Sequence, residues 1–112
     1  MKLESKLEKF PGYITLPDFM NIRQVRQFED AYFGDLNELT KAPEARVFVS
    51  VSDERILPFI LDFVKEWHID GLPDKPKLED IPMTPIHVSH EFIQWIASAL
   101  FTMWKGEEVP NE

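Results

Sequence analysis

The chain lacks several residue patterns that particular chemistries require. It contains no cysteine, which excludes a disulfide framework and a cysteine-ligated zinc site. Its only four glycines, Gly12, Gly34, Gly71 and Gly106, are isolated from one another, so the chain has no glycine-rich phosphate-binding loop. These absences direct attention away from nucleotide chemistry and from metal-stabilised small folds.

Long hydrophobic runs are also missing. No stretch approaches the roughly 20 apolar residues that a membrane-spanning helix needs. Residues 1–9 alternate charges with single leucines, so they lack the apolar segment of a signal peptide. We expect residues 1–12 to form a mobile N-terminal arm that is frayed or weakly helical.

Positive charge is scarce. The 12 basic residues stand against 20 acidic residues, the net charge is −8, and no basic stripe is visible. Because phosphate backbones and anionic lipids repel such a chain, we expect neither nucleic acid nor membrane as a partner. A DNA mimic would carry denser runs of carboxylates than this sequence contains.

The chain does contain enough apolar residues for one hydrophobic core. It has 112 residues, of which 44% are hydrophobic and 12% aromatic. This length is typical of one domain and suffices to bury a modest core. We therefore treat residues 1–112 as a single domain.

The first half of the chain shows signals for a short strand and a helix. Residues 13–16 are β-prone and lie between a Pro-Gly turn signal and Pro17, which indicates a short N-terminal β-hairpin. A helix then begins near Asp18 or Asn21, and Gln24 completes a capping box with Asn21. Gly34 is predicted to end that helix, with residues 36–43 as a connector.

The middle of the chain is less clear. Residues 46–52 are β-branched and partly alternate, which favours a strand, although Pro43 with Glu44 could instead open a helix there. From residue 53 to residue 67 an apolar face recurs at helical spacing, so a helix is predicted. Pro58 implies that this helix either kinks or begins near that residue.

A proline-rich strap and a last helix complete the predicted layout. Residues 69–88 contain four prolines and should form a stiff, extended strap. We expect its inward contacts to be Leu72, Leu78, Ile81 and Met83.

The last helix is predicted over residues 89–105 with Ser89 as its cap, or from an earlier start at Thr84-Pro85. Gly106 should stop it, and residues 106–112 form an acidic tail. The sequence therefore predicts a mainly α, compact single domain of three to four helices with a short N-terminal β-hairpin.

The last helix carries more apolar surface than one core needs. On a helical wheel, its polar residues Gln94, Ser98, Thr102 and Lys105 fall within an arc of about 80°, and Phe101 borders that arc. Either the helix is central in the fold, or part of this surface binds another protein. We favour an interface, because a domain of this size cannot easily surround one helix. The candidate protein-binding residues are Phe92, Trp95, Leu100, Phe101, Met103 and Trp104.

No pattern of residues predicts catalysis. His87, His90 and Glu91 have helical spacing, but His68 lies on the other side of the strap, so three convergent metal ligands are not expected. The serines lack the glycines of a nucleophile elbow. We predict a non-enzymatic protein with no catalytic residue, cofactor or metal.

The order of features resembles the tail assembly chaperone group encoded by long-tailed bacteriophages and prophages. The resemblance spans residues 13–105 and is carried by Trp67-His68-Ile69-Asp70-Gly71-Leu72-Pro73, by Pro82-Met83-Thr84-Pro85, and by Phe92-Ile93-Gln94-Trp95-Ile96. It implies a protein of the host-cell cytoplasm that binds the tape measure protein, assists assembly of the tail tube and often self-associates. The alternatives are a structural head–tail or tail subunit, and an acidic regulator that neutralises a partner protein.

Overall fold

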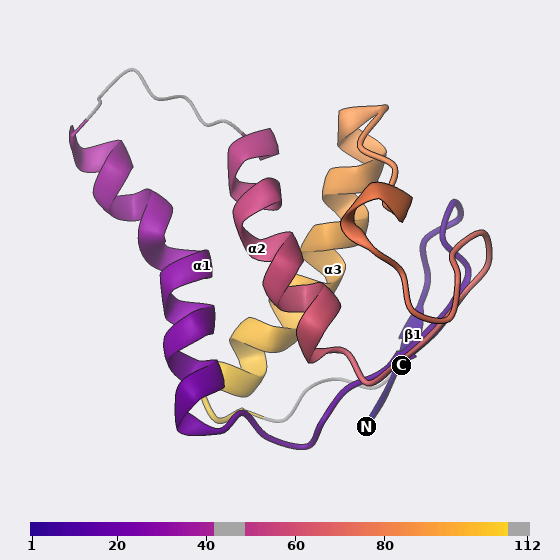
Figure 1. Cartoon of the computed structure of the whole chain (residues 1–112), viewed down its shortest axis with the longest axis horizontal. Coiled ribbons are helices and arrows are strands. Elements are labelled where there is room, and N and C mark those ends of the chain that lie inside the picture. The colour runs from indigo at the N-terminus through magenta and orange to yellow at the C-terminus, as the bar shows by residue number, and fades with distance from the viewer. Residues whose placement is uncertain (42–48, 108–112) are drawn as a thin grey trace.

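In the computed structural model, the described part of the chain forms three helices and a three-stranded antiparallel sheet (Figure 1). The structure describes residues 1–41 and 49–107, and for residues 34–41 and 49–52 it describes the backbone. The elements are β1 (Lys2–Ser5), β2 (Gly12–Thr15), α1 (Ile22–Lys41), α2 (Val49–Phe63), β3 (Glu66–Ile69), the single 3₁₀ turn η1 (Leu78–Asp80) and α3 (Ile86–Trp104). The predicted mainly α single domain with an N-terminal β-hairpin is confirmed.

The sheet buries one face and exposes the other. Leu3, Ile14 and Trp67 are register partners across β1, β2 and β3, and all three are buried. On the opposite face the ring of Tyr13 stacks on that of His68 at 4.5 Å, beneath the Lys2 ammonium at 4.4 Å. This alternation follows from the two-residue period of a strand and orients the sheet against the helices.

The expectation of a weakly helical N-terminal arm is wrong. Residues 2–5 form β1 and pair with β2, while Leu3 and Phe10 belong to the core. The ring of Phe10 stacks on that of Phe92 in α3, with centroids 4.2 Å apart. Pairing with β2 satisfies the backbone of this segment and places Leu3 in the core, so tertiary contacts override the local pattern.

Helix α1 begins as predicted and ends later than predicted. The side chain of Asn21 accepts the Gln24 N–H at 2.8 Å, and that of Gln24 accepts the Asn21 N–H at 2.9 Å, which confirms the capping box. The predicted end at Gly34 and the connector from residue 36 are wrong, because the helix runs on to Lys41. One glycine inside a helix costs only about 1 kcal/mol, which is too little to end a helix by itself.

Helix α2 lies earlier in the chain than predicted. It contains residues 49–52, so the strand predicted there is wrong for these residues, while residues 42–48 lie outside the described chain. Pro58 is inside the helix, which neither ends nor begins there. The prediction that the helix extends to Trp67 is also wrong, since residues 66–69 form β3 against β2.

Helix α2 packs between α1 and α3, and the sheet and strap lie beside α3 (Figure 1). The core contains fully buried residues from the sheet and from all three helices, among them Ile14, Phe28, Ile60, Ile93 and Leu100. No helix in the described residues is long and apolar enough to span a membrane.

The strap supplies three of its four predicted inward contacts. Ile81 is buried, and Leu72 and Met83 pack against the core, as expected. Leu78 does not: it lies on η1 and is 51% exposed. The short 3₁₀ turn points it outward, so the extended geometry assumed for the strap does not hold there.

The boundaries of α3 test two predicted caps. The helix starts after Pro85, so the earlier start is correct and Ser89 is not the cap. Ser89 is buried in the helix, and its hydroxyl donates to the carbonyls of Pro85 and Ile86 at 3.3 Å each.

Gly106 ends the helix at φ +82°, with Gly106 N–H bonded to Met103 O and Glu107 N–H to Thr102 O. This pattern is a Schellman motif, so the predicted glycine stop is confirmed, while residues 108–112 lie outside the described chain.

Candidate protein-binding surface

Four half-buried aromatic side chains from two helices lie together at the C-terminal end of α3. They are Tyr32 and Phe33 of α1 and Phe101 and Trp104 of α3, and we call them the aromatic surface. Each packs against the buried core while keeping part of its ring accessible to solvent. Apolar rings that remain partly accessible are typical of surfaces that bind another protein.

The rings contact one another directly. Tyr32 stacks on Phe101 with centroids 5.2 Å apart, and Phe101 stacks on Trp104 at 5.7 Å. Phe33 lies 5.0 Å from Trp104 and 6.2 Å from Phe101. Beneath them, the fully buried Phe28 stacks on Tyr32 at 5.0 Å. The surface is therefore a continuous layer of rings anchored in the core, and its side chains have little freedom to lose on binding.

Polar groups at the edge fix the orientation of this layer. The Trp104 indole Nε1–H donates to the carboxylate of Glu29 at 3.1 Å, which ties α3 to α1. The Lys105 ammonium lies 4.9 Å from the Phe101 ring centroid and also 3.3 Å from Glu107. A rim of charges around an apolar centre is the usual anatomy of a protein interface.

The six residues predicted to bind protein are separated by the fold. Phe92 and Leu100 are 0% exposed, so they are core residues and not accessible to a partner. Phe101 and Trp104 lie in the aromatic surface, and Met103 packs partly buried at the same end of α3. Trp95, also partly buried, lies about 120° around α3 from Phe101. Helix α3 is central along much of its length and half-exposed at its C-terminal end.

The α1 half of this surface is absent from the six residues predicted to bind protein. Tyr32 follows Phe28 at helical spacing, which favours the inward side of the helix, and neither Tyr32 nor Phe33 is among the six predicted residues. The adjacent pair of aromatics at positions 32 and 33 was the available signal, since neighbouring helical residues lie about 100° apart and cannot both point into the core. Their contact with α3 joins residues about 70 positions apart, which no local pattern reveals.

The histidines form no shared site. His90 Nδ1 lies 3.1 and 3.2 Å from the two carboxylate oxygens of Asp53, which is fully buried on α2. His68 instead contacts Glu66 at 3.2 Å on the exposed face of the sheet. Within the described residues, no three metal-ligating side chains come together. The Asp53–His90 pair orients an imidazole and joins two helices.

Comparison with models of known protein families, with characterised proteins and with solved structures finds no match to this chain.

Proposed function

We propose that this chain is a non-catalytic protein-binding protein that acts as a phage tail assembly chaperone, with the tape measure protein as its client. The observation that carries the protein-binding part is the aromatic surface formed by Tyr32, Phe33, Phe101 and Trp104. The specific client is suggested by the layout of residues 13–105, which resembles the tail assembly chaperone group.

The aromatic surface suits an amphipathic helix. Its rings are large and rigid, so a partner's leucine or methionine side chains can pack across them without ordering long flexible groups. The net charge of −8 keeps the free chain soluble while this surface is accessible. Release then requires only that the client's helices find other partners in the assembled tail, with no nucleotide and no cofactor.

Co-purification from the natural host, with its prophage induced, tests the proposal. A tagged wild-type chain should recover a long helical tape measure protein or tail tube protein, identified by mass spectrometry. Phe101→Ser should lower that recovery at least about tenfold, which is the effect expected when an interface anchor is removed. Phe19→Ser is the matched control, because Phe19 is 72% exposed but lies before α1, outside the aromatic surface.

Other outcomes contradict the proposal. Retention of the chain in purified virions would identify a structural subunit, since a chaperone leaves the finished tail. Recovery of a basic host protein with no tail component would identify an acidic regulator. Equal losses for Phe101→Ser and Phe19→Ser would show that the aromatic surface is not the contact.

A further inference from the structure

The edge of the sheet at β1 carries backbone groups that β2 does not use. The Leu16 N–H donates to Met1 O at 2.7 Å, and the Met1 ammonium donates to Leu16 O at 2.7 Å. Because bonded pairs alternate along an antiparallel ladder, Leu3 bonds toward β2, while Lys2 and Glu4 direct their N–H and C=O groups away from it. In the described part of the chain no strand pairs with this edge. Such outward-facing groups can bond to another strand.

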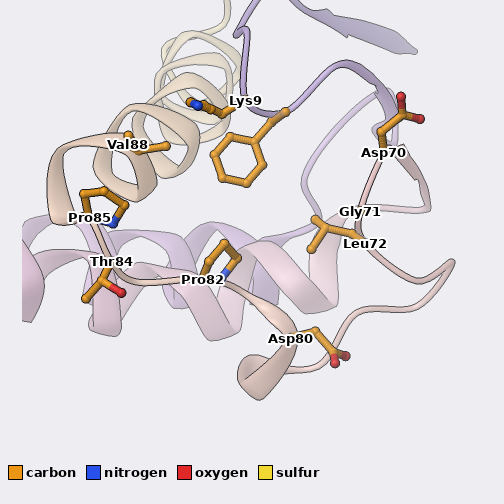
Figure 2. Close-up of a pocket in the computed structure, with 10 residues that line it drawn as sticks. Lys9, Asp70, Gly71, Leu72, Asp80, Pro82, Thr84, Pro85 and Val88 are labelled. Carbon is orange, nitrogen blue, oxygen red and sulfur yellow. The ribbon is translucent and has the colours of Figure 1, made fainter.

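The opposite edge, at β3, is already in contact with the strap. Ile69 is the last residue of β3, and its carbonyl oxygen accepts the Leu72 N–H at 3.1 Å. Figure 2 shows Leu72 directed toward Pro82, which comes later in the strap, and both residues line the same pocket. The strap therefore occupies the end of the β3 edge, so a further strand is expected to pair at β1.

The exposed side chains of β1 carry opposite charges two residues apart. The side chains of Lys2 and Glu4 are 51% and 56% exposed, and their charged atoms lie 3.3 Å apart. The Lys2 ammonium is also 4.4 Å from the Tyr13 ring centroid, which places this pair on the solvent face of the sheet. Leu3, between them, is buried on the other face. A lysine on an edge strand usually discourages pairing, so a partner strand has to place a carboxylate opposite Lys2.

Two copies of β1 meet this requirement in one register. Symmetric antiparallel pairs that use the outward-facing groups are centred on Lys2, on Leu3 or on Glu4. A pair centred on Lys2 or on Glu4 places that residue opposite its own copy, and like charges directly opposite are unfavourable. A pair centred on Leu3 places Lys2 of each copy opposite Glu4 of the other. In that register β1 is complementary to itself in both charge and backbone hydrogen bonding.

We propose that β1 pairs with β1 of a second copy of this chain, antiparallel and centred on Leu3. Lys2 of each copy exchanges backbone hydrogen bonds with Glu4 of the other, and the two side chains pair on the solvent face. The two-fold axis makes the interface the same on both copies and continues the sheet across them. Since β1 has only four residues, the contact is small and the dimer weak, with a dissociation constant of about 10 µM to 1 mM. The β1 edge lies outside the aromatic surface, so the inference does not rest on the proposed function.

Charge reversals test the register. The dimer of the full chain, carrying any tag at its C-terminus, is measured by sedimentation equilibrium and by the concentration dependence of the Lys2 and Glu4 amide signals in NMR spectra. Lys2→Glu and Glu4→Lys each place like charges opposite one another, and each should weaken the dimer about fivefold or more. Repulsion between acidic chains predicts something different, because Glu4→Lys lowers the net negative charge and would then strengthen the dimer. Strengthening by Glu4→Lys would overturn the proposal.

A charge exchange provides the rescue. The double variant of Lys2→Glu with Glu4→Lys keeps the net charge of −8 and restores opposite charges, so it should dimerise within about threefold of the wild type. An equimolar mixture of the two single variants should form a heterodimer. Lys75→Glu is the matched control for Lys2→Glu, since Lys75 is exposed in the strap, and circular dichroism verifies that each variant folds.

Three results would contradict pairing through β1. The first is a chain that stays monomeric up to about 1 mM, the upper limit of the expected range. The second is an equal loss of dimer in Lys75→Glu and Lys2→Glu, which would assign the effect to net charge. The third is a dimer lost in Phe101→Ser and retained in both β1 single variants, which would place the contact at the aromatic surface.

Discussion

The buried carboxylate of Asp53 and the ring of His90 join α2 to α3, with His90 Nδ1 at 3.1 and 3.2 Å from the two carboxylate oxygens. When it is ionised, the Asp53 carboxylate can only accept hydrogen bonds, and His90 Nδ1–H is then the donor in this contact. Asp53 is fully buried, whereas the His90 side chain keeps 36% of its surface exposed. The imidazole therefore supplies a donor to a carboxylate that water does not reach.

Loss of this donor should destabilise the fold. We expect His90→Ala to lower the free energy of unfolding by about 1–3 kcal/mol, since the Asp53 carboxylate would remain buried without this hydrogen bond. Urea denaturation followed by circular dichroism measures the change. His87→Ala is the control: His87 is exposed three residues earlier in α3 and should change stability by less than about 0.5 kcal/mol. Equal effects would show that the Asp53–His90 contact contributes little.

The capping box at the start of α1 should contribute measurably and cooperatively. Asn21→Ala removes the acceptor for the Gln24 N–H, and we expect a loss of about 1 kcal/mol. Because Asn21 and Gln24 bond reciprocally, the double variant with Gln24→Ala should lose less than the sum of the single losses. Strict additivity in urea titrations would contradict the reciprocal pairing. Gln27 is exposed in the same helix, so Gln27→Ala serves as the surface control.

Gly12 should tolerate no side chain. It lies in β2 at φ +133°, and an added Cβ would overlap the carbonyl oxygen of His68 and lie 2.9 Å from Ile69 Cα. We expect Gly12→Ala to cost at least about 2 kcal/mol, because backbone strain adds to disruption of the β2–β3 pairing. Gly106→Ala measures the backbone strain alone, because Gly106 has φ +82° with open space around it. We expect this variant to lower the free energy of unfolding by about 1 kcal/mol. Thermal unfolding of both variants checks the ranking, which equal shifts in Tm would refute.

Two phenylalanines of α3 should differ in what they contribute. Phe92 is fully buried between Phe10 and Trp67, so Phe92→Ser should cost about 3–5 kcal/mol or prevent folding. Phe101 is half-buried against Tyr32, and Phe101→Ser should cost about 1–2 kcal/mol while leaving a folded chain. Urea titration gives both values. A Phe101 variant as unstable as the Phe92 variant would place Phe101 in the core and remove it from the aromatic surface.

Features set by neighbouring residues were predictable from the sequence. The reciprocal bonds of Asn21 and Gln24 and the stop of α3 at Gly106 each depend on a few adjacent residues, as does the start of α3 after Pro85, which the sequence offered as the alternative to Ser89. The helical period of α3 likewise indicates that this helix carries more apolar side chains than one core needs. For this reason Phe101 and Trp104 could be named as candidate contacts.

The elements that sequence analysis missed depend on partners far away in the chain. Residues 2–5 and 66–69 become strands because both pair with β2, and a four-residue strand carries too weak a local signal to compete with helical periodicity. Asp53 opens the helix predicted over residues 53–67 but lies inside α2, where it makes a hydrogen-bond contact with His90, 37 residues away. The candidate site divides in the same way: the helical period of α3 located Phe101 and Trp104, whereas packing of α1 against α3 brought Tyr32 and Phe33 beside them. Local bonding determines caps and periods, and only tertiary packing decides which side chains remain exposed.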